Sequence, residues 1–117
     1  MTQGPTEVLK TGLELPLISA PMFLASGVDL VVAQCCAGVI GTFPALNARP
    51  AAELDNWLVQ IEARLDAHRH ATGKTPAAYG VNLIVNDYNE RLEEDLATLV
   101  RHKVPLVITS LSAPDKV

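Results

Sequence analysis

The 117-residue sequence contains only two cysteines, and these are adjacent, at Cys35 and Cys36. Adjacent cysteines cannot form an ordinary structural disulfide bond, and they do not match a spaced metal-ligand motif. The sequence therefore predicts neither a disulfide framework nor a metal centre built on thiolates. The simplest interpretation of both residues is small apolar side chains on a helix.

Positive charge is sparse as well, with nine Lys and Arg against thirteen Asp and Glu and a formal net charge of −4. The basic residues are scattered along the chain, which argues against a nucleic-acid partner. No basic region followed by an apolar core opens the sequence, so no secretory signal is expected. The longest nearly apolar stretch, 28–43, is interrupted by Asp29, Gln34 and two glycines, which argues against a membrane span. We therefore expect a soluble, cytoplasmic protein without a membrane partner.

Nucleotide-binding glycine motifs are absent too: no G-x-G-x-x-G follows the first expected strand, and no P-loop occurs. What the sequence does contain is an apolar fraction of 49%, ample for the core of one domain. Apolar, β-type runs alternate with segments of helical periodicity. Strands are expected at four places, namely 16–20, 39–43, 78–85 and from 104 or 106 to 109.

Helices are expected between these strands. The first covers 28–36, with Ser26 or Asp29 as its cap and Gly38 at its end. The longest runs from Pro50 to Gly73 and has an apolar stripe with intervals of four, three and four: Leu54, Leu58, Ile61 and Leu65. Asn89 can cap the third. Its charged residues are expected to form a solvated face: Glu90, Arg91, Glu93, Glu94 and Asp95.

The order βαβαβαβ, with strands that are apolar on both sides, predicts parallel strands joined by right-handed crossovers. An open doubly wound sheet and a (β/α)8 barrel both fit this order, but the first lacks its glycine signature. A barrel needs about 250 residues. We therefore expect an α/β protein, the N-terminal half of a (β/α)8 TIM barrel, in which residues 1–117 form roughly the first four β/α units of one truncated domain.

Two features of this pattern point to a binding site. In 16–22 an apolar strand is stopped by Pro21, with Ala20 before it and Met22 after it, and ligands of α/β proteins bind where such strands end. Asn82 interrupts an otherwise apolar run, and a buried amide needs partners. It either satisfies the backbone of a neighbouring loop or donates to a ligand, and the residues alone leave both open.

With these segments in place, the sequence from about residue 13 onward resembles the N-terminal half of nitronate monooxygenases, the flavin-dependent barrels formerly called 2-nitropropane dioxygenases. The order and spacing of the matching pieces are specific to this resemblance: Leu17-Ile18-Ser19-Ala20-Pro21-Met22, 29–34 with 37–49, Gly80-Val81-Asn82, and Ile108-Thr109-Ser110-Leu111 with Ala113-Pro114. The resemblance implies an FMN-dependent oxidoreductase that oxidises alkyl nitronates with dioxygen.

The resemblance also implies a cofactor site. FMN would lie across the carboxyl-terminal mouth of the barrel, with Ala20, Pro21 and Met22 at the flavin ring and Asn82 in a flavin hydrogen bond. Phe43 and Ser110 would lie at the same mouth. The family's phosphate cradle comes from late strands and its catalytic histidine follows strand five, so no catalytic residue is assigned in this chain.

The three histidines, His68, His70 and His102, belong to helix ends and are not candidates for that catalytic role. The spacing of His68 and His70 does not place them on one helix face, which argues against a metal-ligand pair. Where the family pattern has a glycine after the fourth strand, this chain has Ser112.

Two alternatives to a nitronate monooxygenase follow from the same observations. A flavin-type enoyl-acyl carrier protein reductase shares this half of the barrel. Alternatively, the chain is a catalytically silent half-barrel or assembly module, whose unpaired strand edges would favour a homo-oligomer.

Overall fold

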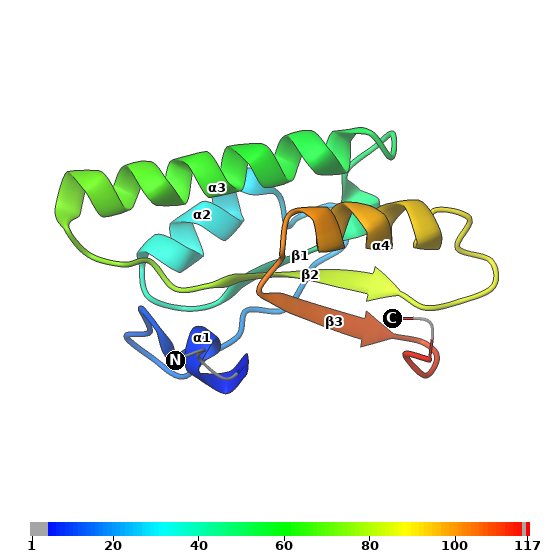
Figure 1. Cartoon of the computed structure of the whole chain (residues 1–117), viewed down its shortest axis with the longest axis horizontal. Helices are drawn as coiled ribbons and strands as arrows, with labels where there is room; N and C mark the ends of the chain where they lie inside the picture. The colour runs from blue at the N-terminus through cyan, green and yellow to red at the C-terminus, as the bar shows by residue number, and fades with distance from the viewer. Residues whose placement is uncertain (1–4, 116) are drawn as a thin grey trace.

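The computed structural model describes residues 5–115 and residue 117. Its elements follow the expected alternation of helices and strands (Figure 1), with these bounds: α1 (Pro5–Lys10), α2 (Val28–Cys36), β1 (Gly41–Pro44), the 3-10 helix η1 (Ala45–Asn47), α3 (Glu53–Thr72), β2 (Tyr79–Ile84), α4 (Leu92–Arg101) and β3 (Leu106–Ser110). None of the described helices combines the length and the apolar composition that crossing a bilayer requires.

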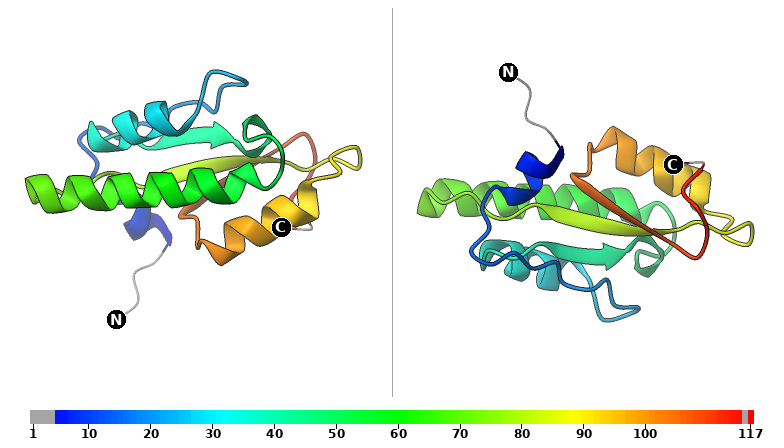
Figure 2. Two further views of the ribbon diagram at one scale, coloured as in Figure 1. Left: turned by 90° about the horizontal axis from the view of Figure 1, so that it is seen from above. Right: turned by 90° about the horizontal axis from the view of Figure 1, so that it is seen from below.

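The three strands form one parallel sheet in the order β1-β2-β3, so neighbours in the sequence are neighbours in the sheet. Helices α2, α3 and α4 all lie on one face of this sheet, whereas α1 lies on the opposite side (Figure 1), and the views from above and below agree (Figure 2). A doubly wound sheet places its crossover helices on both faces, whereas a barrel places them all outside. The predicted fold class, a partial (β/α)8 barrel, is thus confirmed.

The expected first strand is much shorter than predicted. The segment before Pro21 pairs with the chain at a single parallel bridge, Ile18 to Ile40. Ser19 N donates to Ile40 O at 2.9 Å, and Ile40 N donates to Leu17 O at 3.0 Å. A proline at each end of the segment removes two backbone donors, which limits the ladder that it can form. The segment nevertheless lies beside β1, in the position of a first barrel strand.

The core lies between the sheet and the three helices on its covered face. Side chains alternate along a strand, and Phe43, Val81 and Leu83, each with no exposed surface, point toward the helices. The apolar stripe of α3 packs against them and is buried as predicted: Leu54, Leu58, Ile61 and Leu65. Each such side chain contributes about 1.5–3 kcal/mol by burial, so this layer holds the sheet and helices together.

The predicted cap of α2 is wrong for both candidates. Gly27 is the residue before the helix, and no side chain caps it. Ser26 is buried, and its Oγ accepts a hydrogen bond from Met22 N at 2.8 Å, so it closes a loop instead. Asp29 pairs with Arg64 of α3 at 2.6 Å. The predicted end at Gly38 is consistent with its φ of +94°, which glycine adopts without strain.

Candidate functional site

The candidate site lies at the carboxyl ends of the strands, on the face of the sheet away from the crossover helices. Because Val81 and Leu83 point toward the helices, Asn82 between them faces the other, inner side. The register sets Asn82 opposite Ile108 and Ile84 opposite Ser110. Asn82 and Ser110 therefore share the inner face of two neighbouring strands.

The Asn82 side chain bridges these two strands. Its Nδ2 donates to Ile108 O at 2.9 Å and to Ser110 Oγ at 3.1 Å, and the residue is only 9% exposed. Both amide hydrogens thus have partners on β3, which supports the structural interpretation of this buried amide. The amide oxygen remains the group that can accept a hydrogen bond from a ligand.

The segment Ala20–Met22 follows the bridge at Ile18 and so ends the first strand at the same edge of the sheet. Ala20 is exposed, Pro21 is half-buried, and Met22 is 44% exposed. These three residues present a small side chain, a rigid ring and a thioether at the surface. Such a surface suits contact with a flat aromatic ring.

Phe43 does not join this surface through its side chain. The ring is fully buried in the covered layer, and its centroid lies 5.5 Å from that of Trp57 of α3, with the planes tilted by 53°. The predicted role of Phe43 at the flavin stays a prediction, and the side chain has a structural role in the core.

Sequence reasoning assigned no role to Asn47, at the end of η1. Its side-chain amide makes three hydrogen bonds to the loop between Met22 and Ser26. A polar residue in the short turn after a strand, at the edge where ligands bind, is the available signal. The structure thus adds Asn47 to the surroundings of the candidate site.

The predicted solvated face of α4 is wrong at two positions. Asp95 is fully buried, and the Arg91 side chain, which is 20% exposed, donates to Asp95 Oδ1 at 3.0 Å. Burial raises the pKa of Asp95, although Arg91 opposes this effect. The pair connects the start of α4 to the interior near η1.

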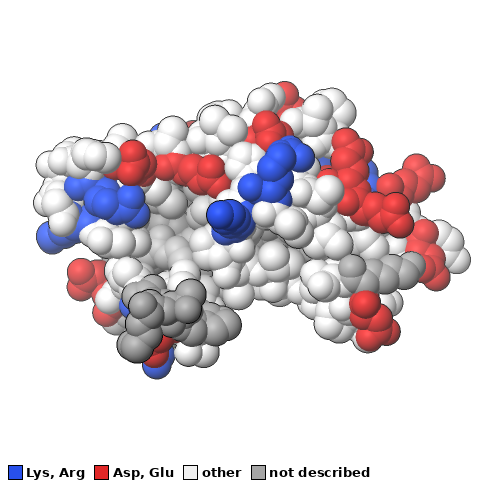
Figure 3. Space-filling view, viewed as in Figure 1, with Lys and Arg blue, Asp and Glu red and all other residues white. Residues whose placement is uncertain are grey.

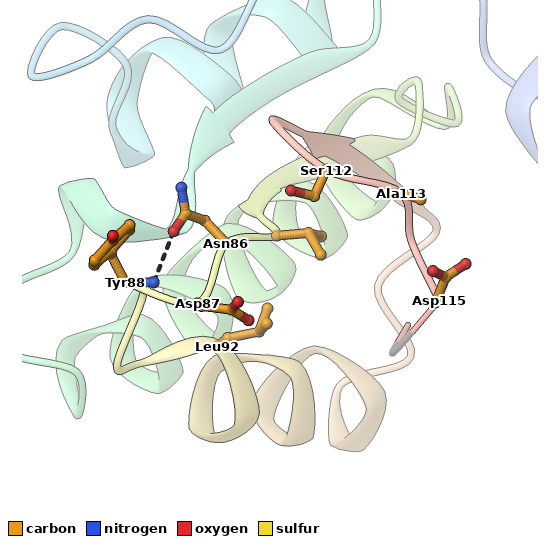
Figure 4. Close-up of a pocket in the computed structure, with 8 residues that line it drawn as sticks. Asn86, Asp87, Tyr88, Leu92, Ser112, Ala113 and Asp115 are labelled. Carbon is orange, nitrogen blue, oxygen red and sulfur yellow. Dashed lines mark hydrogen bonds between the residues drawn. The ribbon is translucent and has the colours of Figure 1, made fainter.

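A cavity of about 580 Å³ lies beside the site, between the loop after β2 and the segment after β3 (Figure 4). This volume is within the usual range for ligands, about 300–1,000 Å³. Figure 3 shows acidic side chains gathered around the start of α4 and the loop before it, which disfavours an anionic ligand there. The lining differs from the predicted flavin site: Val85, Asn86, Asp87, Tyr88, Leu92, Ser112, Ala113 and Asp115.

His102 is the only described histidine that is held by carboxylates from another helix, and it lies far from this edge. Its Nε2 is 2.6 Å from Asp55 and its Nδ1 is 3.3 Å from Glu62, both on α3, and its side chain is 12% exposed. Burial alone lowers the pKa of His102, but the two carboxylates outweigh it and raise the pKa. Tyr79, which begins β2, donates to Glu62 at 2.9 Å. This network ties α3 and α4 together at the amino-terminal end of the sheet, where a barrel is stabilised rather than active.

His68 and His70 lie in the last turns of α3, half-buried and exposed respectively, as predicted. Within the described residues, no group of three or more His, Cys, Asp or Glu side chains could hold a metal ion.

These features define a class of protein. The chain has a parallel α/β fold with its crossover helices on one face, which is part of a TIM barrel. Polar and apolar groups lie together at the carboxyl ends of its strands. No protein-family model matches the chain, and no curated protein matches its sequence.

Two solved structures share the fold in particular. FabK from Thermotoga maritima is similar with 21% identity and a TM-score of 0.73, over 95% of this chain and 31% of FabK. A mutant of FabK from the same organism gives 19% identity and a TM-score of 0.71, over 95% of this chain and 33% of the mutant. The chain thus spans about a third of the length of these structures.

Proposed function

We propose that this chain forms one wall of the flavin site of an FMN-dependent oxidoreductase. The observation behind this proposal is that Ala20–Met22, Asn82 and Ser110 come together at the carboxyl edge of a partial barrel. That edge is where barrel enzymes bind their ligands. The fold shared with FabK and the sequence segments that resemble nitronate monooxygenases support the same assignment.

The residues at this edge fit a flavin ring. The ring is flat, with donors and acceptors along its edge, and the Asn82 oxygen could accept one of its hydrogen bonds. Ser110, bonded to Asn82 at 3.1 Å, fixes the amide so that this oxygen has one orientation. Pro21 and Met22 supply an apolar surface that would exclude water from the ring. When bound, FMN would supply the electron transfer, and the protein would supply placement and orientation.

The test is a titration of the chain with flavin, followed by the amide and methyl resonances of the labelled protein. We expect weak binding that shifts the resonances of Met22 and of the Asn82 side chain. Riboflavin should shift the same resonances with about the same affinity as FMN, because this wall contacts the ring and not the phosphate. Shifts confined to other surfaces would refute the proposal.

Asn82→Ala should weaken flavin binding, because it removes the acceptor at the ring; one hydrogen bond corresponds to about 1 kcal/mol, or roughly fivefold in affinity. The matched control is Asn56→Ala, since Asn56 is an exposed amide on α3 whose Nδ2 donates only to Glu53. Unchanged affinity in Asn82→Ala would leave Asn82 with its structural role alone.

The substrate belongs to the proposal as well. We favour an alkyl nitronate oxidised with dioxygen, and the second candidate is an enoyl thioester on an acyl carrier protein. The two are distinguished in a longer, flavin-binding enzyme of which this chain would form one wall. A nitronate would cause dioxygen consumption, whereas an enoyl thioester would cause oxidation of a reduced nicotinamide. The compartment proposed for this activity is the cytoplasm.

A silent assembly module is the remaining candidate, and the sheet edges favour it. Within the described residues β3 pairs only with β2, and Leu17 and Ile18 at the other edge are 54% and 53% exposed. Such edges pair readily with further strands. A homo-oligomer in sedimentation experiments, without flavin shifts at Met22, would favour this module over the enzyme.

A further inference from the structure

One side chain from another part of the chain holds the loop that follows the first strand. Asn47 Nδ2 donates to Met22 O at 3.0 Å and to Ser26 O at 2.9 Å, and its Oδ1 accepts from Leu24 N at 3.0 Å. An asparagine amide has two donor hydrogens, so both are used on this loop. Each of the three contacts is to backbone, which fixes the path of the chain rather than one side chain.

Packing holds only the Ser26 end of this loop, where Ser26 is buried and its Oγ accepts a hydrogen bond from Met22 N at 2.8 Å. Leu24 is 71% exposed, and its φ of +62° lies in the left-handed region that a leucine rarely adopts. Phe23 is also exposed, at 63%, and the Arg49 guanidinium lies over its ring, 5.5 Å from the ring centroid. An exposed loop with a disfavoured backbone conformation needs specific hydrogen bonds to stay in it. Asn47 supplies the bond to the amide of the disfavoured residue itself.

The backbone on both sides of Asn47 is in turn held by Arg91, whose side chain is half-buried. Arg91 Nη1 donates to Ala48 O at 2.6 Å, and its Nη2 donates to Ala45 O at 3.2 Å, so the guanidinium bonds carbonyls on both sides of Asn47. The same Nη2 donates to Asp95, whose side chain is 1% exposed. A planar guanidinium can contact all three acceptors at once, whereas a lysine ammonium has no such fork.

We propose that Asn47 is the positioning residue of the site, and that Arg91 and Asp95 form its support. Asn47 sets the backbone at Met22, and so the surface that Pro21 and Met22 offer to a ring. This role rests on the proposed flavin function. The three residues do not touch the flavin; they act through the loop.

The first test is amide hydrogen exchange in the whole chain. In Asn47→Ala the Leu24 amide should exchange about tenfold faster or more, which corresponds to about 1.4 kcal/mol. The amide of Val81, in the centre of the sheet, should keep its rate, which separates a local effect from global unfolding. In the control Asn56→Ala all loop amides should keep their rates. An unchanged Leu24 rate in Asn47→Ala overturns the proposal.

Conservative variants sharpen the test. Asn47→Asp keeps an acceptor for Leu24 N but sets a carboxylate against two carbonyl oxygens, so Leu24 should stay protected while the flavin-induced shift at Met22 is lost. Arg91→Lys should speed exchange at Leu24 by a smaller factor than Asn47→Ala. An Asn47→Asp variant with unchanged Met22 shifts would show that the two donor contacts do not position the site, and would overturn the proposal.

Flavin titration separates this proposal from the one on which it rests. Asn47→Ala should weaken riboflavin binding by up to about tenfold, because the apparent affinity falls with the fraction of molecules in which the loop holds the binding conformation. Suppose that the loop opens in Asn47→Ala but wild-type protein shows no flavin-induced shifts. The flavin function then fails, and the positioning role toward flavin fails with it, whereas the role of Asn47 in holding the loop remains. If wild type binds flavin and Asn47→Ala binds it equally well, the positioning role alone fails.

Discussion

Phe43 offers a sharp test, because the resemblance places it at the flavin and the structure packs its ring in the core. Phe43→Leu removes the aromatic pair with Trp57, which is worth about 0.5–1.5 kcal/mol beyond burial. It also leaves part of a fully buried site unfilled, at a cost of about 1 kcal/mol for a small cavity. We expect a total loss of about 2 kcal/mol, a large share of the stability of a small domain.

The assay is urea unfolding followed by tryptophan fluorescence. Trp57 is the only tryptophan in the sequence, and it lies against Phe43, so its emission reports on this layer directly. With a slope of about 1.5 kcal/mol per molar urea, a loss of about 2 kcal/mol lowers the midpoint by roughly 1.3 M.

The matched control is Phe23→Leu, the same substitution in the other phenylalanine of the chain. Phe23 is 63% exposed, so its replacement should change the free energy of unfolding by no more than about 0.5 kcal/mol. Equal midpoints for Phe43→Leu and wild type would refute the packing argument. A loss of flavin affinity in Phe43→Leu at unchanged stability would instead indicate that the Phe43 side chain contacts the flavin.

Three further predictions use the same unfolding assay or chemical labelling. The raised pKa of His102 means that its ion pairs stabilise the fold fully below about pH 6.5 and less as pH rises through the folded pKa. The difference in the free energy of unfolding between wild type and His102→Gln should therefore become smaller as the pH is raised from about 6 to about 9. A difference that stays constant over this range would contradict the prediction. Burial raises the pKa of Cys35 to about 11 and also raises that of half-buried Cys36. Because Cys36 is the more accessible thiol, a thiol reagent at about pH 8 should label Cys36 before Cys35, as followed by mass spectrometry. Gly38→Ala should cost more stability than Gly73→Ala in the same urea assay. φ is positive at both glycines, but a Cβ at Gly38 would overlap the Glu14 side chain, whereas at Gly73 no described atom lies within 4 Å of it.

The hydrophobic pattern predicts correctly those strands and helices whose buried side chains are also their apolar ones. The stripe of α3 and the apolar run of β2 are examples, and the predicted bounds of β2 and α2 lie within one residue of the observed ones. Asn82 stands out as a candidate site residue because a polar side chain within a buried apolar run needs hydrogen-bond partners. Where local chemistry and burial agree, a single sequence is enough.

The failures share one physical cause, which is that sequence does not show which residues meet across long separations. Phe43 could face either side of the sheet, because alternation gives two faces without saying which one the helices cover. Arg91 and Asp95 have the charges of a surface helix, and only the distant carbonyls of Ala45 and Ala48 explain why Arg91 turns inward to pair with buried Asp95. The first strand, before Pro21, is predicted too long, because the apolar content of a segment does not show that its prolines lack backbone N–H donors.

The chain of contacts from Asp95 to Asn47 has a consequence for folding order. Asn47 reaches back 23 residues to Leu24, and Arg91 reaches back 43 residues to Ala48. Contacts of such separation form only after the intervening loops have closed. During synthesis, which proceeds from the N-terminus, the segment at Met22 emerges early but cannot settle until α4 has left the ribosome and docked. The part of the site that is made first is therefore not complete until most of the chain has been made.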